Sequence, residues 1–380
     1  MPEIYDAAIC GAGPAGCSAA LALGKSGFKV VLIEKDHFPR EKPCGDALPA
    51  YVPKVLESID PSFAEAFLGI AEKNNINTCR VSSPSRKIVD IGFRENGYVI
   101  RRSVFDNFMA GLAGSLSNVE IRQGVAVTGI HIDKNLVTVT AGNNFELKAR
   151  LLIGCDGARS IAAAELIKGK PGEGITSVAV RGYFRNVKGL TPGTIEIHFM
   201  KNLLPGYFWI FPLDENTCNA GLGVMASDSR RINLRKELYR IMNEEPDMRE
   251  RFAGSEPEGD LKGHILPLFT GKKIISGYRF MLCGDAASTV NPATGAGAGQ
   301  AMQTGRYAGW QAAKCLLKDD FSEDFMRSYD RTVHEKLWVE NRKYLFILEH
   351  ILRHEKRLNL AVGLAARSMA VSRIIGTILA

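Results

Sequence analysis

The chain has 380 residues, of which 46% are hydrophobic and 23% charged, and it contains 38 glycines. This composition is typical of a folded, turn-rich protein with two domains or one large domain, and it excludes a disordered chain. The formal net charge of +7 comes without a dense run of basic residues, so we do not expect a nucleic-acid partner.

The cysteine and histidine patterns argue against metal and dithiol chemistry. No two of the eight cysteines form a Cys-x-x-Cys pair, and the seven histidines lack metal-ligand spacing. The first residues lead directly into an apolar segment, which leaves no room for a secretory signal peptide. We therefore expect a cytoplasmic protein that binds no metal.

Residues 7–34 have the pattern of a dinucleotide-binding unit, in which a strand, a tight glycine-rich turn and a helix follow one another. Apolar residues 7–10 predict the strand, and the alanine-rich segment 17–23 predicts the helix. The turn is expected to bind phosphates at the positive end of the helix. Its residues are Gly11, Ala12, Gly13, Pro14, Ala15 and Gly16. A second strand, 28–33, ends at Glu34, whose carboxylate can accept hydrogen bonds from an adenosine ribose.

The first half of the chain continues with short helices and strands. The predicted helices are 51–56, 62–70 and 103–116, the last with Ser103 as N-cap and Asp106 as its capping partner. The predicted strands are 76–81, 87–91 and 98–100, followed by a β-meander of 125–132, 136–140 and 145–148 that leads into 151–157.

The second half is expected to form a separate sheet and a helical end. Its strands are 177–184, 194–200, 207–212 and 217–224, with a last buried strand at 279–283. Its helices are 232–243, 300–317 and the stretch from Ser322 to the end. The apolar segment 358–380 contains Arg367 and Arg373, which argue against a bilayer span. Such an amphipathic segment either packs on the protein or lies on a membrane surface.

A second ligand site is predicted where the strand 279–283 ends. Gly284 gives backbone access there, and Asp285 adds a carboxylate at the edge where open α/β sheets bind ligands. Asp285 could bond a polyol such as the ribityl chain of a flavin. The glycine-rich run 292–299 has no strand leading directly into it. We interpret it as the bare N-terminus of the next helix, which would stabilise negative charge on a ring system.

Two further features leave more than one interpretation open. Cys44 is the one cysteine in a polar loop, beside Arg40 and Lys42, and it could be a proton donor, a flavin contact or a bystander. Aromatic residues alternate along the strand 207–212, a pattern that suits a protein core as well as the wall of an apolar tunnel.

Four motifs follow one another along about 300 residues of the chain. They are Gly11-x-Gly13-x-x-Gly16, Arg102-x-x-Phe105-Asp106, Cys155-Asp156-Gly157-Ala158-Arg159-Ser160, and Gly284-Asp285 with Pro292 and Gly295. This series resembles the motifs of the flavin monooxygenase superfamily typified by para-hydroxybenzoate hydroxylase. Two more runs, Pro43-Cys44-Gly45 and Pro205-Gly206-Tyr207-Phe208-Trp209-Ile210-Phe211-Pro212, are similar to motifs of geranylgeranyl reductases, a branch that reduces isoprenoid double bonds.

The resemblance implies an α/β fold with a Rossmann-like FAD-binding domain of the para-hydroxybenzoate hydroxylase type, an inserted antiparallel β substrate domain and a helical C-terminus. The FAD-binding domain would comprise residues 1–75, 98–170 and 272–320. The substrate domain would comprise 76–97 and 171–271, and the helical region 321–380.

The resemblance also implies which residues bind the cofactor, FAD. Glu34 would hold the adenosine ribose, Arg102 the pyrophosphate region, and Val125 the adenine through its backbone. Lys35 is also an implied cofactor contact. The residues implied at the phosphates and ribityl chain are Asp156, Gly157, Gly284 and Asp285. Those implied at the isoalloxazine are Pro292, Gly295, Ala296 and Gly297.

The flavin and the reacting carbon would be bordered by Arg40, Cys44 and Asp46, and Gly45 of the same loop would also contact the cofactor. An apolar tunnel would be lined by Tyr207, Trp209 and Phe211. Asp46 departs from the reductases, which often carry glycine there, so the loop need not work in the same way. Cys44 is the candidate catalytic acid.

We therefore expect an FAD-dependent oxidoreductase that saturates double bonds of an isoprenoid lipid by hydride transfer from reduced FAD. Its electrons would come from an external donor such as NAD(P)H, ferredoxin or a quinol. One alternative is a monooxygenase, hydroxylase or halogenase acting on an aromatic or polyketide substrate. Another is a non-catalytic flavoprotein that binds a lipid or quinone. Membrane contact through the C-terminal helices would place the protein at the inner face of the membrane.

Overall fold

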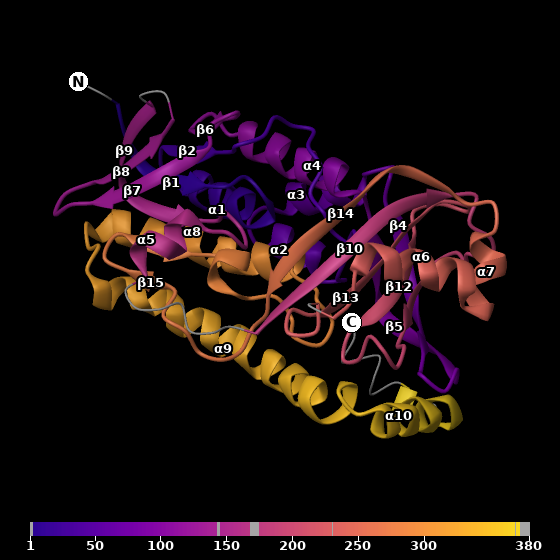
Figure 1. Cartoon of the computed structure of the whole chain (residues 1–380). Helices are drawn as coiled ribbons and strands as arrows, with labels where there is room; N and C mark the ends of the chain where they lie inside the picture. Colours follow the sequence, from indigo (N-terminus) through magenta and orange to yellow (C-terminus); the bar gives the residue numbers. More distant parts are fainter. Residues whose placement is uncertain (1–2, 143–144, 168–174, 230, 369, 373–380) are drawn as a thin grey trace.

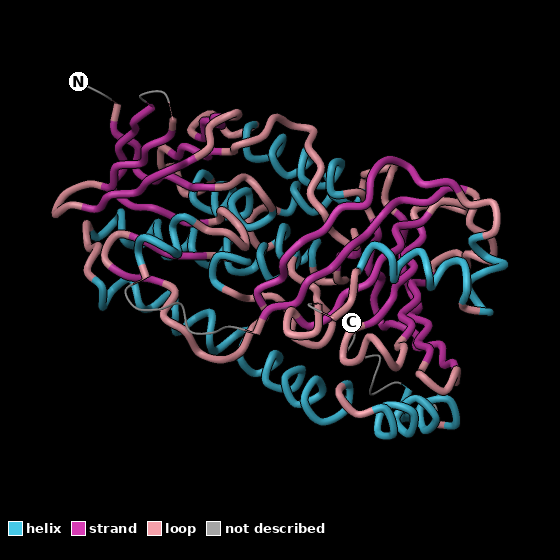
Figure 2. Tube along the Cα trace, in the orientation of Figure 1, coloured by secondary structure: helices cyan, strands magenta, loops and turns pink. Residues whose placement is uncertain are grey.

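Two eight-stranded β-sheets form the framework of the computed structural model, which describes residues 3–142, 145–167, 175–229, 231–368 and 370–372 (Figure 1, Figure 2). The first sheet lies at one end of the molecule and the second at the other. The long helix α9 (Glu323–Ile347) runs along one side, from the first sheet toward the second (Figure 1).

The first sheet contains the predicted dinucleotide-binding unit. Its strand order is β15-β16-β9-β1-β2-β6, and the β7–β8 hairpin joins through β8 to β9. The strands are β1 (Ile4–Cys10), β2 (Val30–Ile33), β6 (Val119–Arg122), β7 (Val127–Ile132), β8 (Val137–Ala141), β9 (Phe145–Gly154), β15 (Ser276–Gly277) and β16 (Phe280–Leu282). Its central strands pair in parallel, and β2 is wholly buried, which explains its continuous apolar run.

Helices cover this sheet and lead into its ligand edge. Helix α1 (Pro14–Gly24) is buried over its whole length and packs against α8 (Ala298–Lys318) and α4 (Arg102–Gly114). Small residues make up most of α1, so its neighbours can approach closely. The other short helices are α2 (Val52–Glu57), α3 (Pro61–Leu68), α5 (Ile161–Leu166) and η1 (Gly284–Ala287).

The second sheet is antiparallel except for the parallel pair of β11 and β4, and its order is β14-β10-β13-β12-β11-β4-β5-β3. The strands are β3 (Ala47–Leu48), β4 (Asn74–Ser82), β5 (Ile88–Val99), β10 (Thr176–Arg185), β11 (Thr194–His198), β12 (Tyr207–Pro212), β13 (Cys218–Met225) and β14 (Glu256–Pro267). We did not predict β14. It is the edge strand of this sheet, so its sequence is polar and lacks the apolar alternation of the other strands.

The two faces of the second sheet have different partners. Helices α6 (Leu234–Glu244) and α7 (Pro246–Phe252) cover one face, where Phe208 and Ile210 belong to a hydrophobic core. The other face carries the alternate residues of β12 and a separate core shared with the C-terminal helices. Strand β12 is therefore apolar on both sides because each of its faces packs in a different hydrophobic core.

Three predictions of local structure were wrong. Helix α4 begins at Arg102 with Arg101 as N-cap, so Ser103 is not the cap. The stretches 87–91 and 98–100 belong to one strand, β5, and 145–148 continues into β9 without a break. In both strands the chain continues the sheet register across residues that resemble a turn.

The C-terminal region is helical but not one continuous helix. Ser322 caps α9, which is followed by a π-helical turn, η2 (Leu348–Leu352), and then by α10 (Glu355–Arg367). The chain between η2 and α10 is not helical, so the predicted single helix is corrected here; its part at 373–380 lies outside the described residues. Within the described part of the chain, no helix is long and apolar enough to cross a bilayer.

Candidate active site

A cavity separates the ligand edge of the first sheet from the inner face of the second. Its first wall consists of the loop 42–45, Arg102, Asp285 and the run 292–298; its second wall consists of strands β4, β5 and β10 to β14. The predicted site residues that line it are Pro14, Cys44, Gly45, Arg102, Tyr207, Trp209, Phe211, Asp285, Pro292, Gly295, Ala296 and Gly297. Segments from the beginning, middle and end of the chain therefore meet here.

The turn after β1 requires glycine at its first position. Gly11 has a φ of 95°, and a Cβ there would lie 2.3 Å from the carbonyl oxygen of Cys155. No side chain caps the N-terminus of α1, and a Cβ on Gly13 would meet only the Arg40 side chain, at 3.8 Å. The positive dipole end of α1 therefore has open space beside Gly13, which suits an anionic ligand.

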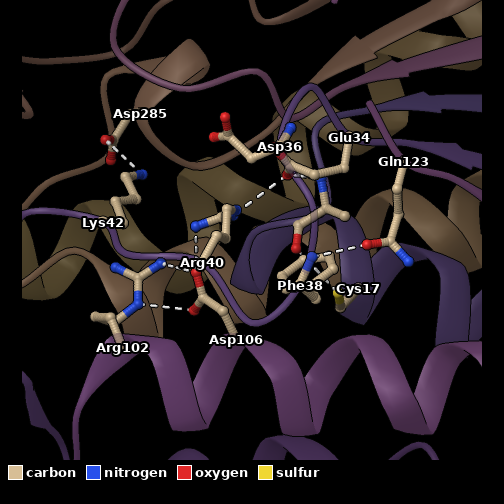
Figure 3. Close-up of polar contacts among 11 residues, drawn as sticks. Cys17, Glu34, Asp36, Phe38, Arg40, Lys42, Arg102, Asp106, Gln123 and Asp285 are labelled. Atoms are coloured by element: carbon tan, nitrogen blue, oxygen red, sulfur yellow. Dashed lines mark hydrogen bonds and ion pairs between the residues drawn. The ribbon is translucent and has the colours of Figure 1, made fainter. Parts of the chain in front are cut away.

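Four charged side chains form a continuous chain beside this turn (Figure 3). Glu34 accepts a hydrogen bond from the Ala12 N–H at 3.0 Å, and the Arg40 guanidinium lies 3.3 Å from the same carboxylate. Arg40 also donates to Asp106 at 2.8 Å. Asp106 accepts two further bonds from Arg102, both 2.7 Å long, and thereby fixes both arginines.

The polar groups in this region fit FAD. The Arg40 Nε atom is buried and has no partner among the described residues. The uncapped helix terminus supplies further donors for phosphate. Glu34 accepts from Ala12, Arg40 and the Asp36 N–H, so acceptor capacity remains for ribose hydroxyls. Donors for two phosphates and an acceptor for a ribose are what the adenosine diphosphate half of FAD needs.

Asp285 lies in η1, near the start of α8, whose N-cap Gly297 has no side-chain partner. Lys42 Nζ lies 3.8 Å and His264 Nε2 3.6 Å from its carboxylate. Burial raises the pKa of Asp285, but Lys42 and His264 outweigh burial and lower the pKa below its usual 3.8. Asp285 is therefore ionised at neutral pH and can accept hydrogen bonds from ligand hydroxyls.

Strand β12 directs three aromatic rings into the cavity. Neighbouring ring centroids of Tyr207, Trp209 and Phe211 are 6.1 Å apart along the strand. The Tyr207 hydroxyl donates to the carbonyl of Thr294 and so connects the second wall to the first. These rings belong to the core shared with the C-terminal helices and also line the cavity. The alternating aromatic residues therefore form part of a hydrophobic core and of a cavity wall at the same time.

The indole of Trp209 lies over a part of the sheet without side chains. Gly221 is its partner in β13, and a Cβ on Gly221 would be 2.5 Å from the Trp209 ring and 2.4 Å from the Val180 carbonyl. Any larger residue would push the indole into the cavity. Glycine at this position therefore allows the ring to lie against the sheet.

A hydrogen-bond network holds the Cys44 loop against the aromatic strand. The Asn219 amide donates to the Cys44 carbonyl at 2.7 Å and to the Asp46 carboxylate at 2.8 Å. Asp46 also accepts from the Tyr183 hydroxyl at 2.8 Å and the Arg102 N–H at 3.2 Å. Asp46 is fully buried, and its backbone turns with a φ of 66° shortly after Cys44. Its side chain therefore lies inside the network that holds this turn.

Burial and neighbouring charges shift the pKa values in this network. Burial raises the pKa of Asp46, although hydrogen bonds from Asn219 and Tyr183 act in the opposite direction. Burial acts against the charge on Arg102, but Asp106 and the side chain of Cys44 outweigh it and raise the pKa of the guanidinium. Arg102 therefore remains a cation within reach of Cys44.

Some predicted cofactor residues lie away from the cavity. Lys35 is exposed. The Val125 N–H donates to the Glu34 carbonyl at 2.9 Å, which leaves only the Val125 carbonyl for an adenine. The Gly284 N–H donates to the Thr304 hydroxyl at 3.0 Å. Their contacts with FAD stay predictions.

Asp156 and Gly157 form the turn that meets Gly11. Asp156 accepts from the Ser160 hydroxyl and, at 3.0 Å, from the Ala162 N–H, so it supports the N-terminus of α5, whose N-cap is Ser160. Gly157 follows with a φ of 83°. The local hydrogen bonds give Asp156 a clear structural role, and its role toward FAD stays a prediction.

Sequence reasoning missed four polar residues of the second wall or its support: Arg181, Tyr183, Asn219 and His264. Arg181 and Asn219 each interrupt an otherwise apolar strand and are 3% and 0% exposed. A buried charge or amide in an apolar strand needs a partner, and that signal could have found both. Asp106, expected to cap α4, instead binds two arginines.

Comparison with known proteins identifies the family. Residues 4–339 match the model of the family described as FAD binding domain. The digeranylgeranylglycerophospholipid reductase of Methanococcus vannielii is 28% identical, over 93% of this chain and 89% of that protein. The menaquinone reductase of Mycobacterium tuberculosis is 30% identical, over 81% of this chain and 76% of that protein.

Solved structures share the fold. A geranylgeranyl bacteriochlorophyll reductase-like protein from Thermoplasma acidophilum has a TM-score of 0.81 at 22% identity, covering 96% of this chain and 91% of that one. The flavin-dependent brominase Bmp2 has a TM-score of 0.79 at 20% identity, covering 98% and 94%. The α/β fold expected from the sequence is confirmed.

Proposed function

The chain belongs to the FAD-binding domain family, in its geranylgeranyl reductase branch, and we propose that it saturates carbon–carbon double bonds in the isoprenoid chain of a lipid. It is an FAD-dependent oxidoreductase. The observation that supports the isoprenoid most directly is the second wall of the cavity. There, β12 presents three aromatic rings, and the adjoining strands β11 and β4 present Ile195, Ile197 and Ile76. Such a wall suits a long apolar chain.

The residues that would hold FAD lie along the first wall. The Gly11–Gly16 turn and Arg40 would bind the phosphates, Glu34 the ribose, and Asp285 the ribityl hydroxyls. The bare N-terminus of α8 at Gly297 would stabilise negative charge on the ring. When bound and reduced, FAD supplies the hydride. We also retain the assignment of 76–97 and 171–271 to a substrate domain.

The chain's own residues would orient the lipid, exclude water and supply a proton. Tyr207, Trp209 and Phe211 would hold an isoprenoid segment across the sheet. Cys44, fixed through its backbone by Asn219, lies on the first wall within reach of the Arg102 cation and is our candidate proton donor. A water held in the same loop is the alternative donor.

The test is reduction of a lipid by the flavin-loaded protein. Purified protein would be reduced with dithionite and incubated with a geranylgeranyl glycerophospholipid or with a menaquinone, because relatives of both names are known. Mass spectrometry would report a gain of two hydrogens for each saturated bond. If reduced protein leaves both lipids unchanged, the proposal fails. Oxygen uptake coupled to substrate would instead indicate an oxygenase.

The physiological electron donor is part of the proposal. NAD(P)H, ferredoxin and a quinol are the three candidates. Each can be mixed with the oxidised protein in the absence of oxygen, and bleaching of the flavin absorbance would identify the donor that reduces it.

Contact with a membrane would bring the lipid to the cavity. Leu348 of η2 lines the cavity, and the exposed Leu360 and Leu364 lie nearby on α10, between Arg357 and Arg367 on the same stripe of the helix. Apolar residues flanked by arginines suit an anionic bilayer surface, which for a cytoplasmic protein is the inner face. Sedimentation with phosphatidylglycerol vesicles, but not with phosphatidylcholine vesicles, is the expected result.

A further inference from the structure

Arg181 is a buried cation with unused hydrogen-bonding capacity. It lies on β10, is 3% exposed and lines the cavity. Its Nε and Nη2 atoms have no partner among the described residues. Unsatisfied charged donors inside a protein are unfavourable, so an arginine held in this state needs an acceptor from elsewhere.

Neighbouring carboxylates do not supply that acceptor. Asp46 and Glu41 are both close enough to interact electrostatically with Arg181. The Asp46 oxygens already accept bonds from Tyr183, Asn219 and the Arg102 N–H, and Glu41 accepts from Lys262. No ion pair of Arg181 occurs within the described ranges.

A second arginine beside the same ring shows the contrast. The guanidinium carbons of Arg101 and Arg181 each lie 4.2 Å from the centroid of the Tyr183 ring. Arg101 donates to both carboxylate oxygens of Glu258, at 2.9 Å each. Of these two arginines, Arg181 is the one whose donors remain free on the cavity side.

The second wall of the cavity changes in polarity from one strand to the next. At one end, β10 and β14 contribute Arg181, Lys262 and His264. Lys262 pairs with Glu41, and the His264 Nε2 atom lies 3.6 Å from the Asp285 carboxylate, so of these three only Arg181 has no ion pair among the described residues. The aromatic strand β12 lies in the middle. At the other end, β11, β4 and β5 contribute mainly apolar side chains. A ligand lying across the strands would therefore meet the unpaired Arg181 guanidinium at one end and an apolar surface at the other.

We propose that Arg181 binds an anionic group of a ligand inside this cavity, and that a phosphate in a lipid head group is the source. Lys262, which pairs with Glu41, is 41% exposed, so this end of the wall reaches solvent and a head group there could extend out of the cavity, while the tail would lie over β12 toward β11. The negatively charged ring of reduced flavin offers the same chemistry and is the second source. The inference rests on FAD filling the first wall, but it does not depend on isoprenoid reduction.

Inorganic pyrophosphate is the probe, added to the FAD-loaded protein so that the phosphate site at α1 is already filled. Binding would be followed by perturbation of the visible flavin spectrum and by the shift in unfolding temperature. Wild-type protein is expected to bind pyrophosphate, Arg181→Met to bind it at least tenfold more weakly, and Arg181→Lys to recover part of the affinity. Arg185→Met is the matched control, because Arg185 lies on the same strand but is exposed and pairs with Glu258.

The two sources give different results. Loss of pyrophosphate binding with an unchanged flavin midpoint potential identifies a phosphate site. A lowered midpoint potential in Arg181→Met, with pyrophosphate binding intact, identifies reduced flavin as the anion. If wild-type protein does not bind pyrophosphate and Arg181→Lys and Arg181→Met leave the potential unchanged, the proposal is wrong. If Arg181→Met does not fold, wild-type protein and Arg181→Lys still decide the question. None of these measurements requires turnover, so they are independent of the proposed reaction.

Discussion

Asp46 and Asn219 are 173 residues apart in the sequence, yet the Asn219 amide donates to the Asp46 carboxylate at 2.8 Å. The same amide donates to the Cys44 carbonyl, and its oxygen accepts from the Trp209 indole at 3.0 Å. One side chain thus joins the loop on the first wall of the cavity to the aromatic strand on the second.

Replacing Asn219 by alanine should weaken the connection between the Cys44 loop and the aromatic strand and so lower the stability of the protein. The buried Trp209 indole N–H would lose its partner, at a cost of about 1–3 kcal/mol in the free energy of unfolding, and the half-buried Cys44 carbonyl would lose its partner at a smaller cost. We expect urea unfolding of Asn219→Ala at a lower midpoint than wild type.

Asn202→Ala is the control for that measurement. Asn202 is exposed and, among the described residues, its amide donates to Glu237 alone, so its loss should change stability by less than about 0.5 kcal/mol. Equal midpoints for the two variants would show that the buried network contributes little.

Asp46 should make stability depend on pH. Burial raises its pKa above the usual 3.8, so the folded state favours the protonated form. The stabilisation from this group is complete below the unfolded pKa and is lost as the pH rises through the folded pKa. We expect the free energy of unfolding of wild type to fall relative to that of Asp46→Asn as the pH rises from about 3.5 to about 7, a range that brackets a raised carboxyl pKa. Urea titrations at several pH values would measure this difference.

The exposed Asp36→Asn variant gives the reference for that titration. The two differences from wild type are compared over the same pH range. A constant difference for Asp46→Asn would mean that burial does not shift the pKa of its carboxyl.

Glu196 should have the opposite pH dependence. It is 1% exposed and pairs with Arg251 at 2.6 Å and with His198 at 3.0 Å. Burial raises its pKa, but Arg251 and His198 outweigh burial and lower the pKa to about 2. Its contribution is therefore present above its unfolded pKa of 4.5 and lost as the pH falls toward 2.

The shift corresponds to roughly 3 kcal/mol of stability at neutral pH. Glu196→Gln should lose about that amount at pH 7 and much less near pH 3, because wild type loses the contribution there. Glu95→Gln removes the exposed pair with Lys54 and should cost no more than about 1 kcal/mol at either pH. Similar losses for the two variants would contradict the assignment.

Gly221 should tolerate no side chain. An alanine methyl would collide with the Val180 carbonyl and the Trp209 ring, at a cost of about 1–3 kcal/mol, and would displace the indole into the cavity. Gly221→Ala should show a lower unfolding midpoint and altered tryptophan fluorescence. Gly263→Ala, on β14, would meet only a carbonyl at 3.4 Å and should leave both unchanged. If Gly221→Ala has the same unfolding midpoint and tryptophan fluorescence as wild type, the close packing of Gly221 against Trp209 is contradicted.

The sequence predicted the first wall of the cavity better than the second. Gly11, Glu34 and Asp285 follow buried strands, so their place at the sheet edge follows from chain order alone. The pairing of β10 with β13 and β14 brings Arg181 beside Gly221 and Lys262, and no local pattern specifies such a register. Sequence reasoning therefore found the residues of the glycine-rich wall but not Arg181, Tyr183 or Asn219.

Local sequence patterns also predicted the wrong role for a residue whose partner is distant in the sequence. Asp106 lies three residues after Ser103, as in a capping box, but it is fully buried and binds Arg40 and Arg102. The spacing alone cannot separate the two roles, because Arg40 reaches Asp106 only through tertiary folding. A buried acid that lies near an arginine in a helix can therefore be an ion-pair partner rather than a helix cap.

Arg102 should contribute to FAD binding through its charge and through Asp106. Arg102→Met would leave the Asp106 carboxylate with Arg40 alone and remove a cation from the cavity wall. Because hydrogen bonds to charged groups contribute about 1.5–3 kcal/mol, the dissociation constant of FAD should rise roughly tenfold to a hundredfold. Arg102→Lys should recover only part of the affinity, since lysine cannot form the paired contact with a carboxylate.

Titration of the apoprotein with FAD, followed by quenching of flavin fluorescence, would measure these constants. Arg94→Met is the control, because Arg94 is exposed on β5 and does not line the cavity. Loss of Arg102 could also weaken binding by unfolding the site, so urea unfolding of each apoprotein must accompany the titration. A variant that remains as stable as wild type but binds FAD more weakly assigns the effect to the contact. Arg102→Met with unchanged FAD affinity would mean that the guanidinium only supports Asp106.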